Sequence, residues 1–230
     1  MNWSTLLLAL LASSAVALPL PALAAGKPPV VVELFTSKGC SSCPPANANL
    51  IELSKRADVL PLSFAVTYWD YLGWKDIFDK PEYTERQVTY EKPLGQQGPY
   101  TPQMVINGAT TVVGNNLDEV NHAIAAAKPI AGPDVTLAAG KVSIGAAVAP
   151  GNADVWLVRY DPNLVEVPVA RGENTGHTLP HTHVVHSLAR LGSWSGTAQS
   201  FEVPTVDSGY KTAVLVQGVG GGPIIGAVTD

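Results

Sequence analysis

The chain of 230 residues has two cysteines, and they form a Cys-x-x-Cys pair, Cys40 and Cys43. Pro44 and Pro45 follow directly and open a stretch with helical spacing of apolar residues, so the pair lies at the predicted start of a helix. The N-terminus of a helix carries partial positive charge, which favours a thiolate over a thiol. A disulfide across so short a loop removes little chain entropy and is a weak structural staple. Redox chemistry is therefore the leading interpretation.

In thiol–disulfide exchange, one thiolate attacks and a second thiol resolves the mixed disulfide. We expect Cys40 to attack, because it comes first and the first sulfur in such turns is the more exposed one. Cys43, one helical turn inward, is then the resolving thiol, and Lys38 adds a positive charge nearby. An inert buried pair, or the relic of a site, is the alternative interpretation.

A metal site is a second alternative for the same cysteines. Thiolates and imidazoles together suit copper(I) or zinc, and His181 and His183 are candidate partners from far along the chain. Two more histidines, His177 and His186, flank them. A solvated histidine-rich loop is the simpler interpretation of this segment, so the prediction contains no metal and no other cofactor.

The first 25 residues carry a Leu- and Ala-rich run that ends in Ala22-Leu23-Ala24. This pattern predicts a signal peptide that is cut after Ala24, and hence a periplasmic or secreted protein; an uncleaved anchor is the alternative. No later stretch is apolar for the roughly 18 residues that spanning needs, so the processed protein is not expected to be an integral membrane protein. A net charge of −5 without a basic block argues against nucleic-acid binding.

The remaining chain divides into two parts with different patterns. Residues 26–128 alternate strands and helices, and a strand, helix and strand at this spacing predict a parallel pair. The expected elements are strands at 30–35 and 59–67, a helix at 44–57 with Ser42 as its N-cap, a hairpin turning at Asn107-Gly108, and a helix at 117–128.

Residues 129–230 lack helical periodicity and show short alternating runs between Gly, Pro and Asn, which predict strands at 135–137, 142–149, 154–160, 165–170, 198–203 and 211–217. This texture is typical of an all-β sandwich of roughly 100 residues. The expected organisation is a signal peptide (1–25), an α/β domain (26–128) and a β-sandwich domain (129–230).

The α/β part resembles the thioredoxin superfamily. The resemblance rests on the strand at 30–35, on Cys40-Ser41-Ser42-Cys43-Pro44, and on Thr101-Pro102 before a later strand. It implies a thioredoxin-like fold with a cis-proline at Pro102 beside the dithiol. The backbone groups of Thr101 would then be placed to pair with an extended substrate chain.

The whole chain is more specifically similar to a family of secreted bacterial proteins of unknown function. The similarity is carried by three motifs, at residues 33–46, 69–74 and 171–174, the last reading Arg-Gly-Glu-Asn. This third motif either binds a carboxylate or forms a structural Arg–Glu knot that shapes its loop. The family implies a fold and a redox site but no substrate.

Three other residues are candidates for the site. Glu33, seven residues before Cys40, is a candidate buried proton acceptor for Cys43, although the acid of thioredoxins lies one residue closer; a surface acid or a pair with a basic residue is the alternative. Trp69 and Trp74 are candidates for an apolar wall that binds substrate, with core packing as the alternative.

Together these features predict an exported thiol–disulfide oxidoreductase that acts on protein or small-molecule thiols and disulfides. The direction of exchange, the electron donor and the oligomeric state do not follow from the sequence. The alternative function is a non-catalytic envelope module that binds a metal or a protein partner, with the cysteines as ligands or relics.

Overall fold

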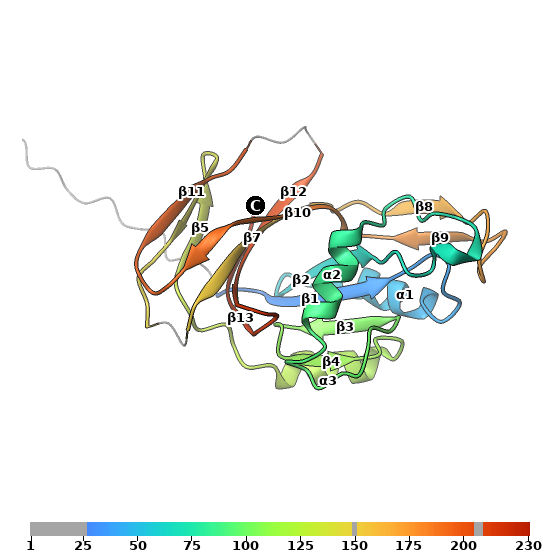
Figure 1. Ribbon diagram of the computed structural model, residues 1–230, viewed down its shortest axis with the longest axis horizontal. Coiled ribbons are helices and arrows are strands. Elements are labelled where there is room, and N and C mark those ends of the chain that lie inside the picture. The colour runs from blue at the N-terminus through green and yellow to red at the C-terminus, as the bar shows by residue number, and fades with distance from the viewer. Residues whose placement is uncertain (1–26, 149–150, 205–208) are drawn as a thin grey trace, which may run out of the picture.

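The computed structural model describes residues 27–148, 151–204 and 209–230, so the expected signal peptide with its cut after Ala24 lies outside the described residues. A mixed eight-stranded sheet runs through the molecule (Figure 1). Its strands, in spatial order, are β13 (Ile224–Thr229), β12 (Lys211–Gly218), β7 (Ala153–Asp161), β10 (Val184–Trp194), β2 (Val59–Ala65), β1 (Val30–Thr36), β3 (Gln103–Ile106) and β4 (Thr110–Val112).

Two smaller sheets and a few helices complete the mixed α/β architecture. One small sheet contains β11 (Gln199–Glu202), β6 (Lys141–Ile144) and β5 (Val135–Ala138), and the other pairs β8 (Val165–Pro168) with β9 (Thr178–His181). The helices are α1 (Pro44–Leu53), α2 (Pro81–Thr89), α3 (Leu117–Ala126) and the short 3₁₀ helix η1 (Asp70–Leu72).

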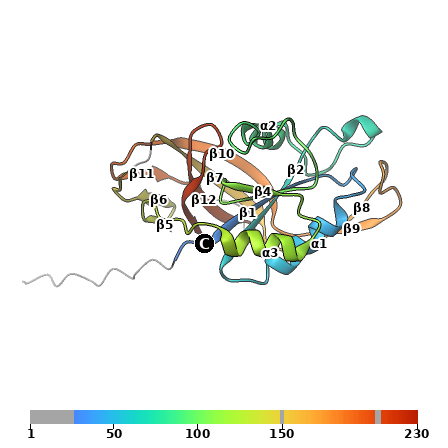
Figure 2. The same cartoon turned by 90° about the horizontal axis from the view of Figure 1, so that it is seen from below.

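The helices cover both faces of the β1 region of the sheet. Helices α1 and α3 pack on one face through Leu50, Leu53 and Ile124, and α2 packs on the other through Tyr83 and Tyr90 at its end (Figure 2). Side chains alternate along a strand, so β1 contributes to both cores. Its residues Val32 and Leu34 face α1 and α3, whereas Val31 and Phe35 face α2.

The start of α1 differs in one detail from the expectation. Pro44 and Pro45 occupy its first turn, where a missing N–H costs no hydrogen bond. The N-cap residue is Cys43, however, and not Ser42, and it makes no side-chain cap. The Ser42 hydroxyl is instead turned toward the sulfur of Cys40, at 3.1 Å.

The predicted hairpin is confirmed. Strands β3 and β4 are antiparallel, and the turn between them has Asn107 and Gly108 at φ values of 49° and 63°. This left-handed conformation at two successive residues is the one that Asn-Gly favours. The Asn107 side chain also accepts a hydrogen bond from the backbone N–H of Val31 at 2.8 Å, which ties the hairpin to β1.

Strand β10 joins the two parts of the chain that the sequence separates. It pairs in parallel with β2, with Val184 opposite Ser63, and antiparallel with β7 on its other side. The sheet is therefore continuous across the expected boundary at residues 128 and 129, while the domain division itself stays a prediction. Among the described residues, no helix is long and apolar enough to cross a membrane.

Candidate functional site

The dithiol lies in the connection between β1 and α1. Both cysteines are free, and both are fully buried, with 0% of each residue exposed. Neither residue exposes surface, so a more exposed Cys40 is not seen, although burial weighs less on the pKa of Cys40 than on that of Cys43. Ser41 and Ser42, which lie between the cysteines, are exposed, so Cys40 sits beneath a thin cover and not in a deep core.

Hydrogen bonds surround the sulfur of Cys40 and stabilise its thiolate. The hydrogen bond from Cys43 lowers the pKa of Cys40 most, burial opposes this, and the Ser42 hydroxyl adds to the lowering, with a resulting pKa of about 6. The carbonyl oxygen of Thr101 lies 3.9 Å from the same sulfur and accepts a hydrogen bond from it only while Cys40 is a protonated thiol, so this contact does not stabilise the thiolate. Cys40 is thus ionised at neutral pH in this arrangement.

Cys43 behaves in the opposite way. Burial raises the pKa of Cys43 far above that of a free thiol, and its hydrogen bond to Cys40 raises it further. The pair therefore consists of a thiolate at Cys40 and a protonated thiol at Cys43. This asymmetry is what an attacking sulfur and a resolving sulfur require.

Thr101, Pro102 and Trp69 gather beside Cys40. The Thr101–Pro102 peptide bond is cis, the conformation that the resemblance implied. Trp69 donates from its indole nitrogen to the Thr101 hydroxyl at 2.8 Å and stacks on Tyr71, with ring centroids 6.3 Å apart. Trp74 is half-buried and makes no hydrogen bond or ring contact with the described parts of the chain.

The Arg-Gly-Glu-Asn segment folds against the dithiol loop from the distant part of the chain. Asn174 is buried and donates two hydrogen bonds, to the carbonyl oxygen of Lys38 at 2.9 Å and to that of Cys40 at 2.8 Å. One carboxylate oxygen of Glu173 accepts from the backbone N–H and the hydroxyl of Ser41, at 2.8 and 2.7 Å. The segment therefore holds the loop in place; an Arg171–Glu173 knot is not formed, because Glu173 bonds Ser41.

Gly172 allows this close approach. Its φ is +97°, and a Cβ atom there would lie 3.0 Å from the Cα of Gly39. A side chain at this position is disfavoured both by the backbone conformation and by the contact. The backbone N–H of Glu173 donates to the Gly39 carbonyl at 3.1 Å, which completes the junction.

Glu33 does not lie where a proton acceptor for Cys43 would be needed. It is fully buried on the α2 face of β1, paired with Arg86 at 2.6 Å and bonded by the Tyr90 hydroxyl. Helix α1, whose N-cap is Cys43, packs on the opposite face. The expected role of Glu33 is corrected accordingly: it neutralises a buried guanidinium.

Lys38 does not supply a free positive charge to Cys40. Its ammonium is buried, forms an ion pair with Asp76 at 2.8 Å and lies over the ring of Phe78 at 4.3 Å. Burial lowers the pKa of Lys38 and opposes its pairing with Asp76. Hydrogen bonds, and not a neighbouring cation, therefore account for the thiolate of Cys40.

The four histidines of the last third do not assemble with the cysteines. His177 is exposed, His183 stacks on Tyr160, and His186 stacks on Tyr210. His181 is buried, and burial together with nearby Lys38 lowers its pKa to about 3. Within the described ranges, no group of three or more His, Cys, Asp or Glu side chains is arranged to hold a metal ion.

Sequence reasoning missed the contributions of Ser42, Asn174 and Asp76. The hydroxyl of Ser42 points at Cys40, Asn174 holds the loop, and Asp76 neutralises Lys38. Asn174 could have been chosen as a candidate, because it is the last residue of one of the three motifs. Its hydrogen-bond partners, however, cannot be predicted from the local sequence pattern. Asp76 follows the aromatic motif and carried no such signal.

The pKa asymmetry predicts the titration of the thiols. In the reduced protein, the thiolate absorbance should rise with a midpoint near pH 6, and Cys43→Ala should move the midpoint toward the value of about 8.5 of a free cysteine. The Cys40→Ser variant should show no transition near neutral pH, because Cys43 stays protonated. A wild-type midpoint near 9 would contradict the assignment.

The role of Asn174 is tested by truncation. Asn174→Ala removes the side-chain donor of the Lys38 carbonyl and leaves the Cys40 carbonyl with its backbone hydrogen bond from Cys43, so the free energy of unfolding should fall by about 2 kcal/mol. Cys40 should also react faster with dithiodipyridine, because its loop is released. Asn163→Ala, at an exposed turn, is the matched control and should change stability by less than about 0.5 kcal/mol. Equal effects of the two substitutions would show that Asn174 does not hold the loop.

Comparisons with known proteins place this chain in a family. Residues 31–217 match the family described as "Protein of unknown function (DUF1223)". The crystal structure of protein AGR_C_4864 from Agrobacterium tumefaciens is similar, with 33% sequence identity, a TM-score of 0.75, and coverage of 90% of this chain and 95% of that one.

A more distant structure, HBP35 of Porphyromonas gingivalis, shares the fold with 14% identity and a TM-score of 0.55, over 89% of this chain and 75% of that one. No curated protein matches the chain significantly. The long match to the family and the identity to the Agrobacterium protein agree. The chain belongs to the DUF1223 family.

Proposed function

We propose that the protein is a thiol–disulfide oxidoreductase with Cys40 as the attacking thiolate and Cys43 as the resolving thiol. The observation that carries the proposal is the placement of the pair: two free cysteines directly before the first turn of α1, with the Ser42 hydroxyl 3.1 Å from the Cys40 sulfur and the Thr101–Pro102 cis peptide beside it. The directions of the pKa shifts agree with this placement, because hydrogen bonds lower the pKa of Cys40 and burial raises that of Cys43. A structural pair of cysteines has no need for such a difference. The position before the first turn of α1 adds the partial charge of the helix N-terminus.

The exchange proceeds in two balanced steps. The Cys40 thiolate attacks one sulfur of a partner disulfide, a new S–S bond forms, and the partner's other sulfur leaves as a thiolate. Cys43 then loses its proton to that leaving sulfur and attacks Cys40. The partner's second sulfur is released, so the partner is reduced by two electrons and the pair is oxidised. The same steps in reverse oxidise a partner dithiol.

Access to Cys40 requires a local movement. Both sulfurs are buried, and the cover consists of the exposed residues Ser41 and Ser42 and the 171–174 segment, which is bonded to Ser41. The Ser42 hydroxyl lies 3.1 Å from the Cys40 sulfur and donates to the Thr101 carbonyl at 3.4 Å. Rotation of this hydroxymethyl group is the movement that we propose to uncover the sulfur.

We infer that residues 26–128 form a thioredoxin-like domain and that the following part is a β-sandwich. The strand order β2-β1-β3-β4, with α1 and α3 on one face and α2 on the other, supports the first inference. The core that the β5–β6–β11 sheet shares with β7 and β12 supports the second.

The proposed export of the protein fits the redox function. An exported protein lies in an oxidising compartment, where a pair of cysteines can form and keep a disulfide.

The aromatic residues beside the dithiol suggest where a substrate binds. Trp69 bonds to Thr101, and Tyr71, stacked on Trp69, is 77% exposed. An exposed ring next to a reactive sulfur fits the apolar side chains around a partner's disulfide. Protein disulfides are accordingly the proposed substrates, with small disulfides as weaker ones.

The proposal predicts a reversible disulfide within the chain. Equilibration in glutathione buffers, followed by mass spectrometry, should give a Cys40–Cys43 disulfide with a reduction potential between about −270 and −120 mV. The protein should reactivate scrambled ribonuclease or reduce insulin, and Cys40→Ser should abolish either activity. Ser200→Ala, on the distant β11, is the control and should leave the activity unchanged.

Two results would argue against an oxidoreductase. One is a pair that stays reduced at every glutathione ratio while the chain remains folded. The other is turnover that persists in Cys40→Ser, which would assign the activity to a contaminant.

A further inference from the structure

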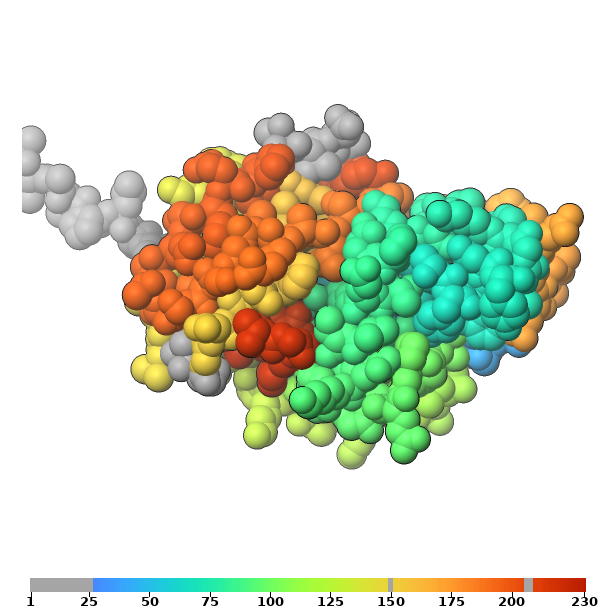
Figure 3. All heavy atoms as spheres, viewed as in Figure 1, coloured from blue at the N-terminus to red at the C-terminus, as the bar shows by residue number. Residues whose placement is uncertain are grey.

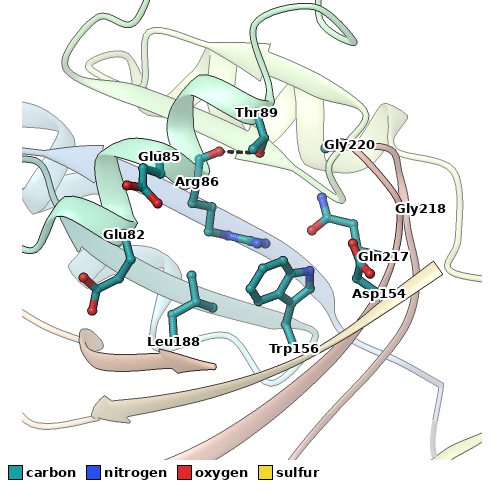
Figure 4. Close-up of a pocket in the computed structure, with 11 residues that line it drawn as sticks. Glu82, Glu85, Arg86, Thr89, Asp154, Trp156, Leu188, Gln217, Gly218 and Gly220 are labelled. Carbon is teal, nitrogen blue, oxygen red and sulfur yellow. Dashed lines mark hydrogen bonds between the residues drawn. The ribbon is translucent and has the colours of Figure 1, made fainter. Parts of the chain in front are cut away.

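A second site is suggested by a pocket that the dithiol chemistry does not use. The pocket has a volume of about 240 Å³ and lies between α2 and strands β7, β10 and β12. Figure 3 shows α2 beside the strands of the second part at the surface, and Figure 4 shows the side chains that line the pocket between them. Its position at the junction of the two parts of the chain is typical of ligand sites.

The floor of the pocket contains a charged side chain whose charge is compensated by an ion pair. Arg86 is only 5% exposed and points toward the middle of the pocket, yet its guanidinium is paired with Glu33 at 2.6 Å and bonds to Tyr90. It also lies 5.5 Å from the ring centroid of Trp156. The floor is therefore rigid and close to neutral, so it does not attract an anion.

Apolar surface forms one side of the pocket. Trp156 from β7 and Leu188 from β10 are only partly buried and lie next to each other beneath α2 (Figure 4). The loop after β12 closes the far end. There Gly221 lies so close to α2 that a Cβ atom on it would be 2.3 Å from the carbonyl oxygen of Thr89. The loop and the helix are therefore in direct contact at this end of the pocket.

The rim of the pocket carries uncompensated negative charge. Glu82 and Glu85 come from the exposed side of α2, and neither forms an ion pair with another described residue. Asp154, on the opposite side, is paired with Arg190 at 2.7 Å. With Arg86 neutralised by Glu33, two negative charges remain at the opening. The potential there favours a cation.

We propose that this pocket binds an organic cation of side-chain size, a primary ammonium or guanidinium group on an apolar stem. The stem packs on Trp156 and Leu188, and the cationic head lies at Glu82 and Glu85. The volume is below the 300–1,000 Å³ typical of sites for drug-sized ligands but above the 150 Å³ of a cavity that binds benzene. It therefore suits a small amine or the side chain of a Lys or Arg residue from a partner protein.

The proposal is tested by titration with probes of equal size and different charge. Benzylammonium, benzyl alcohol and phenylacetate should be added to the folded protein while amide and indole signals are followed by NMR. Benzylammonium should bind most tightly, and it should shift the indole signal of Trp156 and the amides of α2. Nα-acetyl-lysine amide is added in the same titration. Tighter binding of this compound than of benzylammonium would indicate the side chain of a partner protein as the ligand, and weaker binding would indicate a free amine.

Matched variants identify the groups responsible. Glu82→Gln with Glu85→Gln should weaken benzylammonium binding by at least about fivefold and leave benzyl alcohol unaffected. Glu166→Gln, at an exposed position on β8, should change neither. These substitutions conserve shape at surface positions, so the melting temperature should stay close to that of the wild type.

Three results would overturn the proposal. Equal affinity for benzylammonium and benzyl alcohol would show an apolar pocket without charge selection. Unchanged affinity in the double variant would remove the carboxylates from the site. Absence of any shift at Trp156 and α2 would show that the pocket does not bind cations of this kind. None of these results depends on the state of Cys40 and Cys43.

Discussion

The geometry of the dithiol depends on two hydrogen bonds from one side chain. The carboxamide of Asn174 donates to the carbonyl oxygens of Lys38 and Cys40, which lie 136 and 134 residues away in the sequence. The loop that carries the reactive sulfur is therefore held by the other part of the chain. Strand β10 provides the frame for this contact, because it extends the sheet from β2 into β7. The two parts of the molecule form one site, and neither would build it alone.

Charge around the site is compensated locally. Lys38 is neutralised by Asp76, and Arg86 is neutralised by Glu33 on the other face of β1. Buried pairs of this kind contribute little net stability, but removal of one partner is costly. As a result, the field at Cys40 comes from hydrogen bonds and the helix terminus, and not from a free cation. In the pocket beneath α2, the charge of the floor is likewise compensated. The uncompensated carboxylates of the rim therefore determine whether the pocket selects cations.

Local pattern predicted the elements of the first part well and the second part less well. The strand, helix and hairpin around Cys40 carry strong signals, such as the prolines of α1 and the Asn107-Gly108 turn. Strand β10 escaped prediction because it contains polar residues and Gly192 and is interrupted by two shifts of register. The role expected for Glu33 was wrong because the side-chain alternation of β1 directs it away from α1. The contacts of Asn174 depend on tertiary packing, which no local pattern encodes.

In the proposed function, Cys40 exchanges disulfides in the folded protein although its sulfur is covered. Trapping a mixed disulfide under native conditions distinguishes a reactive sulfur from a sealed one. A Cys43→Ala variant, incubated with glutathione disulfide under native conditions, lacks the resolving thiol and should accumulate one glutathione on Cys40, identified by peptide mass mapping. The adduct should form faster when Ser42 is also replaced by Gly, which removes the Ser42 side chain from the cover. An adduct that appears only in denaturant would show that the sulfur is sealed in the native state and would exclude Cys40 as the attacking thiolate.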